Sequence, residues 1–63
     1  MEFKLKDVRE AKEVSQLSLS KMSGISRQTI IEIEDGTRKS ITTDTLAKLA
    51  QALNCNVADL FIA

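Results

Sequence analysis

The sequence predicts an all-α fold, a compact five-helix domain that occupies residues 1–63 as a single unit. Proline is absent, and apolar residues recur at intervals of three and four along the chain, without the alternation typical of strands. A chain of 63 residues is long enough for one core. The lone cysteine and the absence of histidine exclude an internal disulfide and an ordinary zinc site, so packing must stabilise the fold.

The first two helices are expected over residues 3–13 and 16–22. One apolar stripe marks the first helix: Phe3, Leu5, Val8 and Ala11. Ser15 is suited to cap the second helix, because its hydroxyl can accept a backbone N–H two or three residues further on. In that helix Leu19 and Met22 are expected to point inward.

A third helix is expected over residues 27–34, after a turn at Gly24 and an N-cap at Ser26. Ile30 and Ile33 share one face and should be buried, whereas Ile31 should look outward. Residues 35–40 combine turn-forming residues with two adjacent cations, which predicts a loop.

A fourth helix is expected over residues 43–53, capped by Thr42. Its buried stripe comprises Leu46, Leu49, Ala50 and Leu53. Asn54 readily adopts the left-handed conformation that stops a helix, and Asn56 with Asp59 should open a last short helix over 57–61.

The second and third predicted helices form a helix-turn-helix pattern. They are short, a glycine-containing turn joins them, and the second of the pair has a polar N-terminal end. Many purely structural helix pairs share this pattern, so spacing alone leaves DNA binding and a structural role equally open.

Specific residues carry a family resemblance. The segments are Leu5-x-x-Val8-Arg9-Glu10, Val14-Ser15-Gln16-x-x-Leu19-Ser20, Ser23-Gly24-Ile25-Ser26-Arg27-x-Thr29-Ile30-x-x-Ile33-Glu34-Asp35-Gly36 and Thr42-x-Asp44-Thr45-Leu46-x-Lys48-Leu49-Ala50-x-Ala52-Leu53. With the Val57-x-Asp59-Leu60-Phe61 tail, they resemble the Cro and phage-repressor-like (XRE) helix-turn-helix family over nearly the whole chain. The resemblance implies a lambda-repressor-like fold and a small, non-enzymatic transcriptional regulator that binds double-stranded DNA.

The resemblance also implies that the start of the third helix faces base edges in the major groove. The expected base contacts are Arg27, Gln28, Thr29, Ile31 and Glu32. Gln28 can bond bidentately to adenine, and Arg27 can bond to guanine or to a phosphate. Glu32 can only accept hydrogen bonds, so its favourable base partner is the cytosine amino group.

Phosphate contacts are expected at the edges of this surface, from Gln16, Ser26, Arg38, Lys39 and Ser40. Gln16 would lie at a helix N-terminus, where unpaired N–H groups favour an anion. The family also places an internal ion pair at the positions of Arg9 and Glu34, which implies a structural role for these two residues.

Three residues depart from the family pattern: Glu13, Glu32 and Ile41, which replaces a frequent proline and loosens the loop. Glu13 stands where glycine or asparagine often ends the first helix, so either a left-handed conformation there costs roughly 1 kcal/mol or the turn differs from that of the family. Glu32 would be repelled by DNA phosphates unless it is matched to cytosine. The balance of nine basic and nine acidic residues adds no long-range attraction to DNA.

A single module of this size reads few base pairs, so we expect a homodimer on a pseudo-palindromic site. The expected dimer interface comprises Val57, Leu60, Phe61 and Ile62. Closure of the monomer's own core by Leu60 and Phe61 is an equally open alternative.

The main competing function is a protein-interaction module on the same scaffold, with weak or no DNA binding. Glu32, Ile31 and the neutral net charge favour it, whereas the contiguous set of predicted DNA contacts opposes it. An enzyme is disfavoured, because histidine, tyrosine and a glycine-rich phosphate loop are all lacking.

No cofactor, metal, small-molecule ligand or membrane partner is expected from the sequence. No apolar run approaches the roughly 20 residues that cross a bilayer, which predicts a cytoplasmic protein, associated with the nucleoid when bound. Cys55, between two asparagines, is interpreted as a packing residue.

Overall fold

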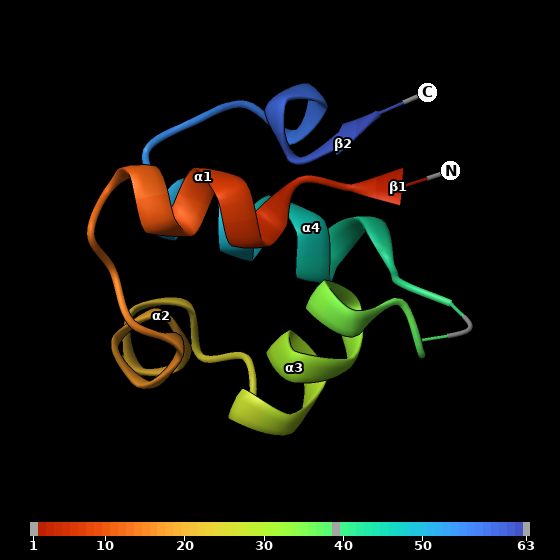
Figure 1. Ribbon diagram of the computed structural model, residues 1–63, viewed down its shortest axis with the longest axis horizontal. Helices are drawn as coiled ribbons and strands as arrows, with labels where there is room; N and C mark the ends of the chain where they lie inside the picture. Colours follow the sequence, from red (N-terminus) through yellow and green to blue (C-terminus); the bar gives the residue numbers. More distant parts are fainter. Residues whose placement is uncertain (1, 39, 63) are drawn as a thin grey trace.

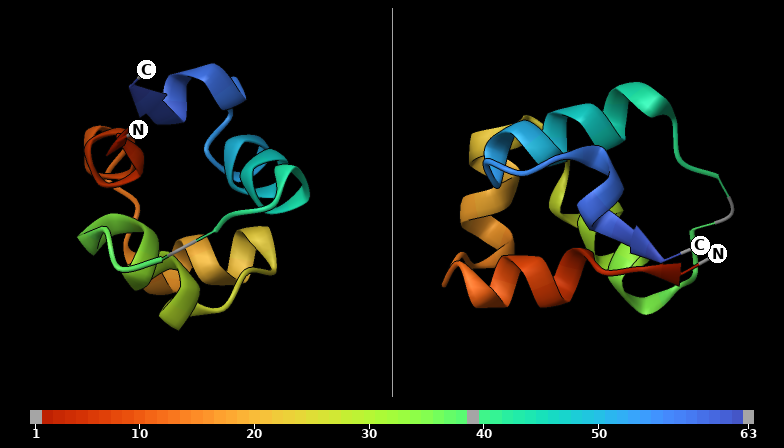
Figure 2. Two further views of the ribbon diagram at one scale, coloured as in Figure 1. Left: turned by 90° about the vertical axis from the view of Figure 1, so that its right-hand side faces the viewer. Right: turned by 90° about the horizontal axis from the view of Figure 1, so that it is seen from above.

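The computed structural model describes residues 2–38 and 40–62, and most of them are helical. The elements in chain order are β1 (Glu2–Phe3), α1 (Leu5–Ala11), α2 (Gln16–Ser23), α3 (Arg27–Asp35), α4 (Thr43–Ala52), the 3-10 helix η1 (Val57–Leu60) and β2 (Phe61–Ile62). The helices surround one core, and β1 and β2 lie side by side (Figures 1 and 2). The predicted helical fold class is confirmed, with one short strand pairing that the sequence pattern did not predict.

Side-chain caps determine where three of the helices begin. The hydroxyls of Ser15, Ser26 and Thr42 each accept the backbone N–H of the residue three positions further on. Gly24 and Gly36 end α2 and α3 with φ angles of 76° and 80°, which glycine adopts without a steric penalty. The boundaries of the helix-turn-helix are therefore set by local interactions.

The first helix is shorter at both ends than the expected 3–13. Phe3 lies in β1, where it pairs with Phe61 in an antiparallel register, and the Lys4 N–H donates to the Leu60 carbonyl at 2.6 Å. This long-range pairing holds the start of the chain in an extended conformation, so α1 begins at Leu5. The prediction that Ala11 belongs to the buried stripe is wrong, since Ala11 is exposed.

The end of α1 contains a left-handed residue, which is the first of the two possibilities that the sequence left open at Glu13. Glu13 has a φ angle of 57°, and this reversal lets the Val14 N–H donate to the Arg9 carbonyl at 3.1 Å. Asn54 has a φ angle of 55° after α4, as expected. Glutamate is strained in this region, because its Cβ crowds the following carbonyl.

Every helix contributes to the core. The buried apolar residues are Leu5, Leu19, Ile30, Ile33, Leu49, Ala50, Leu53 and Leu60. The predicted stripe of α4 is confirmed for its last three members, whereas Leu46 is half-buried. Cys55 is half-buried and packs against this cluster, and burial raises the pKa of its thiol.

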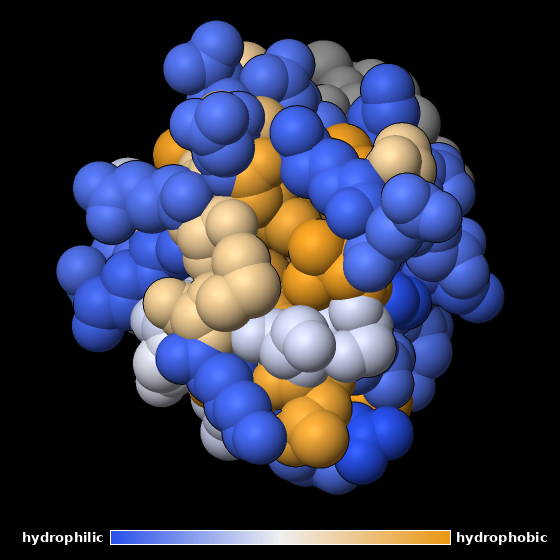
Figure 3. Space-filling view, turned by 90° about the vertical axis from the view of Figure 1, so that its left-hand side faces the viewer, coloured by the Kyte–Doolittle hydropathy of each residue, from blue (hydrophilic) through white to orange (hydrophobic). Residues whose placement is uncertain are grey.

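The prediction that Met22 points into the core is wrong. Met22 is 55% exposed and Leu17 is 49% exposed, so only Leu19 of α2 is fully buried. The helix packs against α3 and α4 through a narrow stripe centred on Leu19, and the side chain of Met22 falls outside it. The side of the molecule that carries α2 shows apolar surface among polar side chains (Figure 3).

The last helical segment differs in type and length from the helix expected over 57–61. It is a 3-10 helix that ends at Leu60, and Phe61 belongs to β2. The Asn56 N–H donates to the Asp59 carboxylate at 3.0 Å, which fixes the start of the turn. Leu60 is only 1% exposed and closes the core.

We predict that Glu13→Gly stabilises the domain by about 0.5 to 1 kcal/mol, because glycine removes the left-handed penalty at some cost in backbone entropy. Urea unfolding followed by circular dichroism measures the change. Lys12→Gly is the matched control, since Lys12 has a φ angle of −95° and should only lose stability. A destabilised Glu13→Gly variant would show that the side chain makes a stabilising contribution larger than the strain.

Candidate nucleic-acid interface

A nearly buried ion pair joins α1 to the last turn of α3. Arg9 donates from Nε to Glu34 Oε2 at 2.8 Å and from Nη2 to Oε1 at 3.1 Å. Its Nη1 donates to the Val14 carbonyl at 2.8 Å. The side chains of Arg9 and Glu34 are 11% and 6% exposed. The hydrogen bond to Glu34 raises the pKa of Arg9, although burial opposes this.

Gln16 connects the start of α2 to the same ion pair. Its Nε2 donates to Glu34 Oε1 at 3.1 Å, and the residue is half-buried. Gln16 and Ile31 also line an open hollow between α1, α2 and α3. Three helices therefore meet at Glu34, and α3 has a fixed position relative to both α1 and α2.

The two faces of α3 differ in character. Ile30 and Ile33 are buried in the core, whereas Arg27 and Gln28 are exposed. Ile31 is half-buried, which is less outward than expected. The helix thus presents polar side chains at its N-terminal end to the surface.

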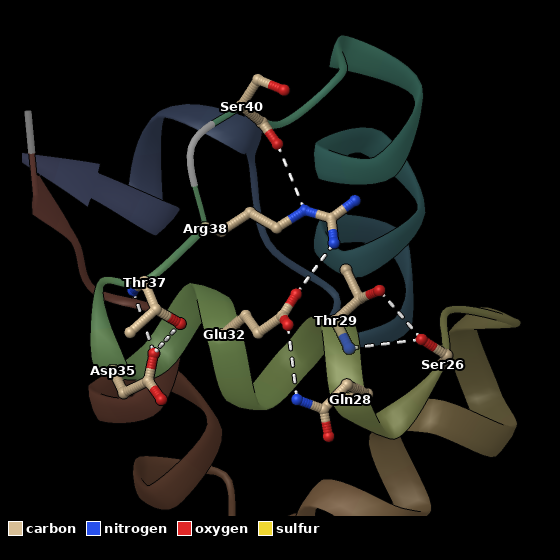
Figure 4. A network of polar contacts seen from close by, with 8 residues as sticks. All are labelled: Ser26, Gln28, Thr29, Glu32, Asp35, Thr37, Arg38 and Ser40. Atoms are coloured by element: carbon tan, nitrogen blue, oxygen red, sulfur yellow. Dashed lines mark hydrogen bonds and ion pairs between the residues drawn. The ribbon is translucent and has the colours of Figure 1, made fainter.

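Ser26 and Thr29 are engaged with each other at the start of α3 (Figure 4). The Ser26 hydroxyl accepts the Thr29 N–H at 3.2 Å, and the two hydroxyls lie 2.8 Å apart in a hydrogen bond. Thr29 is half-buried beside this cap. Their roles in phosphate and base contact remain predictions, and each hydroxyl already has a partner within the protein.

Glu32 lies at the centre of a polar network on the outward side of α3 (Figure 4). Gln28 Nε2 donates to Glu32 Oε2 at 3.3 Å, and Arg38 Nη1 donates to Oε1 at 2.9 Å. The hydrogen bond from Arg38, followed by that from Gln28, lowers the pKa of the Glu32 carboxyl. The negative charge of Glu32 is therefore balanced by Arg38 within the protein.

The turn after α3 brings Arg38 back over Glu32. The left-handed Gly36 reverses the chain, and the backbone N–H groups of Thr37 and Arg38 both donate to the Glu32 carbonyl, at 3.0 and 3.2 Å. Asp35 accepts from the Thr37 N–H at 3.0 Å and from its hydroxyl at 2.7 Å. These bonds lower the pKa of Asp35, so this second outward carboxylate also has a local partner.

Sequence reasoning missed the ion pair between Glu32 and Arg38. A signal existed for the bond between Gln28 and Glu32, because residues four apart are neighbours on a helix surface. The pairing with Arg38 depends on the turn at Gly36, which spacing alone does not specify. Lys39, a predicted phosphate contact, lies outside the described residues, and Ser40 is exposed.

The predicted dimer interface is corrected at Leu60. Its side chain is buried in the monomer's core, so the alternative reading of this residue is the right one. Val57 is half-buried and packs against the same core. The side chains of Phe61 and Ile62 lie outside the described part of the structure.

The chain was compared with known protein families and with solved structures, and both comparisons found similar proteins. The sequence matches a helix-turn-helix family over residues 5–60, which spans α1 through η1. The structure is similar to the high-resolution crystal structure of the restriction-modification controller protein C.AhdI from Aeromonas hydrophila, with a TM-score of 0.85 and 34% sequence identity. The similarity covers 92% of this chain and 86% of that one. No curated protein matches the sequence significantly.

We predict that Glu34→Ala destabilises the domain by about 3 kcal/mol, because Arg9 would be left charged and unpaired in a nearly buried position. The adjoining open hollow lets some water reach Arg9. The expected loss therefore lies at the lower end of the roughly 3 to 5 kcal/mol that removal of one partner of a buried ion pair costs. Urea unfolding measures the loss, with Gln51→Ala, an exposed change on α4, as the control. A Glu34→Ala variant as stable as that control would contradict the structural role of the pair.

Proposed function

Since this chain belongs to the Cro and phage-repressor-like (XRE) family of helix-turn-helix proteins and is a DNA-binding transcription regulator, we propose that it represses transcription as a homodimer on a pseudo-palindromic operator. The observation that carries this proposal is the exposed polar end of α3, on a helix whose opposite face is fixed in the core. The similarity to a controller protein supports gene control as the outcome of DNA binding.

Base readout is assigned to the outward residues of α3. Arg27 is exposed at the first position of the helix, where its guanidinium can reach a guanine edge or a phosphate. Gln28 follows it and can bond to adenine, and Glu32, one turn later, suits a cytosine amino group. Thr29 and Ile31 flank these residues and would contribute methyl contacts to thymine.

Phosphate contacts are assigned to residues on both sides of α3. Gln16 has an amide N–H beyond the one that it donates to Glu34, and it lies at the first position of α2, where the helix dipole favours an anion. Ser26, Arg38, Lys39 and Ser40 would contact the backbone beside the groove. These contacts would determine affinity and register without reading sequence.

The proposed dimer uses the C-terminal region, with Val57, Phe61 and Ile62 as interface candidates. Val57 is only half-buried by the monomer, so part of its side chain is available to a second copy. Leu60 is left out of the proposal, because its side chain is buried in the monomer.

A regulator of this kind is expected to act in the cytoplasm. No helix in the described part of the chain is long and apolar enough to cross a membrane.

The alternative, a protein-interaction module with weak or no DNA binding, is less well supported. Three observations favour it: the acidic Glu32, the apolar Ile31 and the net charge of zero, of which the net charge still holds. Glu32 is compensated by Arg38 and Gln28, and Ile31 is half-buried, so neither requires a protein partner.

Selection from a pool of random duplexes at about 100 mM salt tests the proposed function directly. We expect enrichment of an inverted repeat, because a two-fold symmetric dimer reads two half-sites. A single enriched half-site would contradict the dimer, and no enrichment above a scrambled-sequence control protein would contradict sequence-specific binding.

Gln28→Ala and Lys39→Ala separate base readout from phosphate contact. We expect Gln28→Ala to relax the preference at one base position by about 1 to 3 kcal/mol. Lys39→Ala should weaken all sequences alike and lower the salt slope by about one unit. Fluorescence anisotropy on the enriched duplex and its single-base variants measures both effects, and uniform losses for both variants would argue against readout by Gln28.

A further inference from the structure

Glu32 presents an electrostatic problem for the proposed function. It lies one turn into α3 on the outward side, where a duplex would surround it with phosphates. An uncompensated carboxylate in that position would oppose binding to every sequence. In the free protein, however, Glu32 is already paired with Arg38 at 2.9 Å.

We propose that Arg38 is a positioning residue for Glu32, and that their ion pair stays closed on DNA and makes the base preference opposite Glu32 depend on Arg38. The proposal rests on the proposed function, because it specifies how that surface selects sequence. It assigns Arg38 a role in specificity, in addition to the phosphate contact that its place in the loop suggests.

The hydrogen-bonding capacity of the two side chains permits this arrangement. Arg38 occupies one lone pair of Oε1 and Gln28 occupies one of Oε2, so the carboxylate can still accept the amino group of a cytosine. Arg38 itself has five N–H donors, of which it uses one on Glu32 and one on the Ser40 carbonyl at 3.3 Å. Three donors remain on a side chain that is 42% exposed, so a phosphate contact is compatible with a closed pair.

The backbone holds the pair in place before DNA arrives. The N–H of Arg38 donates to the carbonyl of Glu32 itself, so the backbone that carries one side chain is bonded to the backbone that carries the other. The Ser40 carbonyl holds the guanidinium from the other side (Figure 4). Such preorganisation lowers the conformational cost of using Glu32 as a fixed acceptor.

A double-mutant cycle with Glu32→Gln and Arg38→Gln tests the proposal on the enriched duplex and all its single-base variants. For the wild type we expect a cytosine preference of roughly 5- to 100-fold at one position, the equivalent of about 1 to 3 kcal/mol. Arg38→Gln should remove most of that preference and weaken binding to all sequences. In the Glu32→Gln background, Arg38→Gln should cost less and should act equally on every sequence.

Two further measurements separate positioning from simple charge. Arg38→Lys keeps the charge but loses the planar fork, so it should restore affinity more than cytosine preference. The carboxyl carbon signal of Glu32, followed by NMR against pH, should titrate at a higher pH in Arg38→Gln than in the wild type, because the pair keeps the carboxylate ionised to lower pH. Circular dichroism checks that each variant is folded.

The outcomes are distinguishable. If Arg38→Gln weakens all sequences by the same factor in both backgrounds, Arg38 is only a phosphate contact and the proposal is overturned. If the wild type has no salt-sensitive affinity for any duplex, the proposed function fails, and this inference fails with it. Retained duplex binding with a cytosine preference that is lost both in Glu32→Gln and in Arg38→Gln supports both.

Discussion

The ion pair between Arg9 and Glu34 is the interaction on which the placement of α3 depends. Glu34 lies in the last turn of α3, and its carboxylate is bonded by Arg9 from α1 and by Gln16 from α2. Arg9 also bonds the Val14 carbonyl, which the left-handed Glu13 brings into reach. Removing either charge would leave the other without its ionic partner in a nearly buried position. The three helices are therefore coupled through one carboxylate.

With its last turn fixed in this way and with Ile30 and Ile33 in the core, α3 cannot rotate about its axis without breaking both kinds of contact. These contacts therefore define the orientation of its outward face. Such a defined orientation suits sequence reading, because base contacts require side chains held on a well-positioned element.

The ion pair between Glu32 and Arg38 explains how a chain with no net charge can present a surface suited to a polyanion. The net charge is zero, so no long-range field steers the protein toward DNA. At the surface of α3, however, Glu32 is bonded to Arg38 and Asp35 to Thr37. Arg38 therefore balances the charge of Glu32, whereas Asp35 is hydrogen-bonded but keeps its negative charge, and Arg27 is exposed at the first position of α3.

The sequence predicted the features that depend on near neighbours. The caps at Ser15, Ser26 and Thr42 and the glycine at the end of α2 follow from residue types within one helical turn, and the structure has them as expected. The pairing of Arg9 with Glu34 was expected only from the family resemblance, because no local pattern links residues 25 positions apart.

The features that the sequence did not predict depend on long-range geometry. Phe3 is extended because it pairs with Phe61 near the other end of the chain, which periodicity cannot reveal. Met22 is exposed because only the side of α2 around Leu19 packs into the core, whereas the spacing of the apolar residues predicts that Met22 packs there too. Arg38 reaches Glu32 only because the turn at Gly36 reverses the chain, so this contact required the structure.

The most direct test of the central claim is an NMR titration of the isotope-labelled protein with its enriched duplex. The rigid outward end of α3 should be the contact surface, so the amide signals of Arg27, Gln28 and Glu32 should shift most, and the shifts should diminish as salt rises. Shifts centred instead on Leu17 and Met22, the exposed apolar residues of α2, would show that another face meets the partner and would contradict the account.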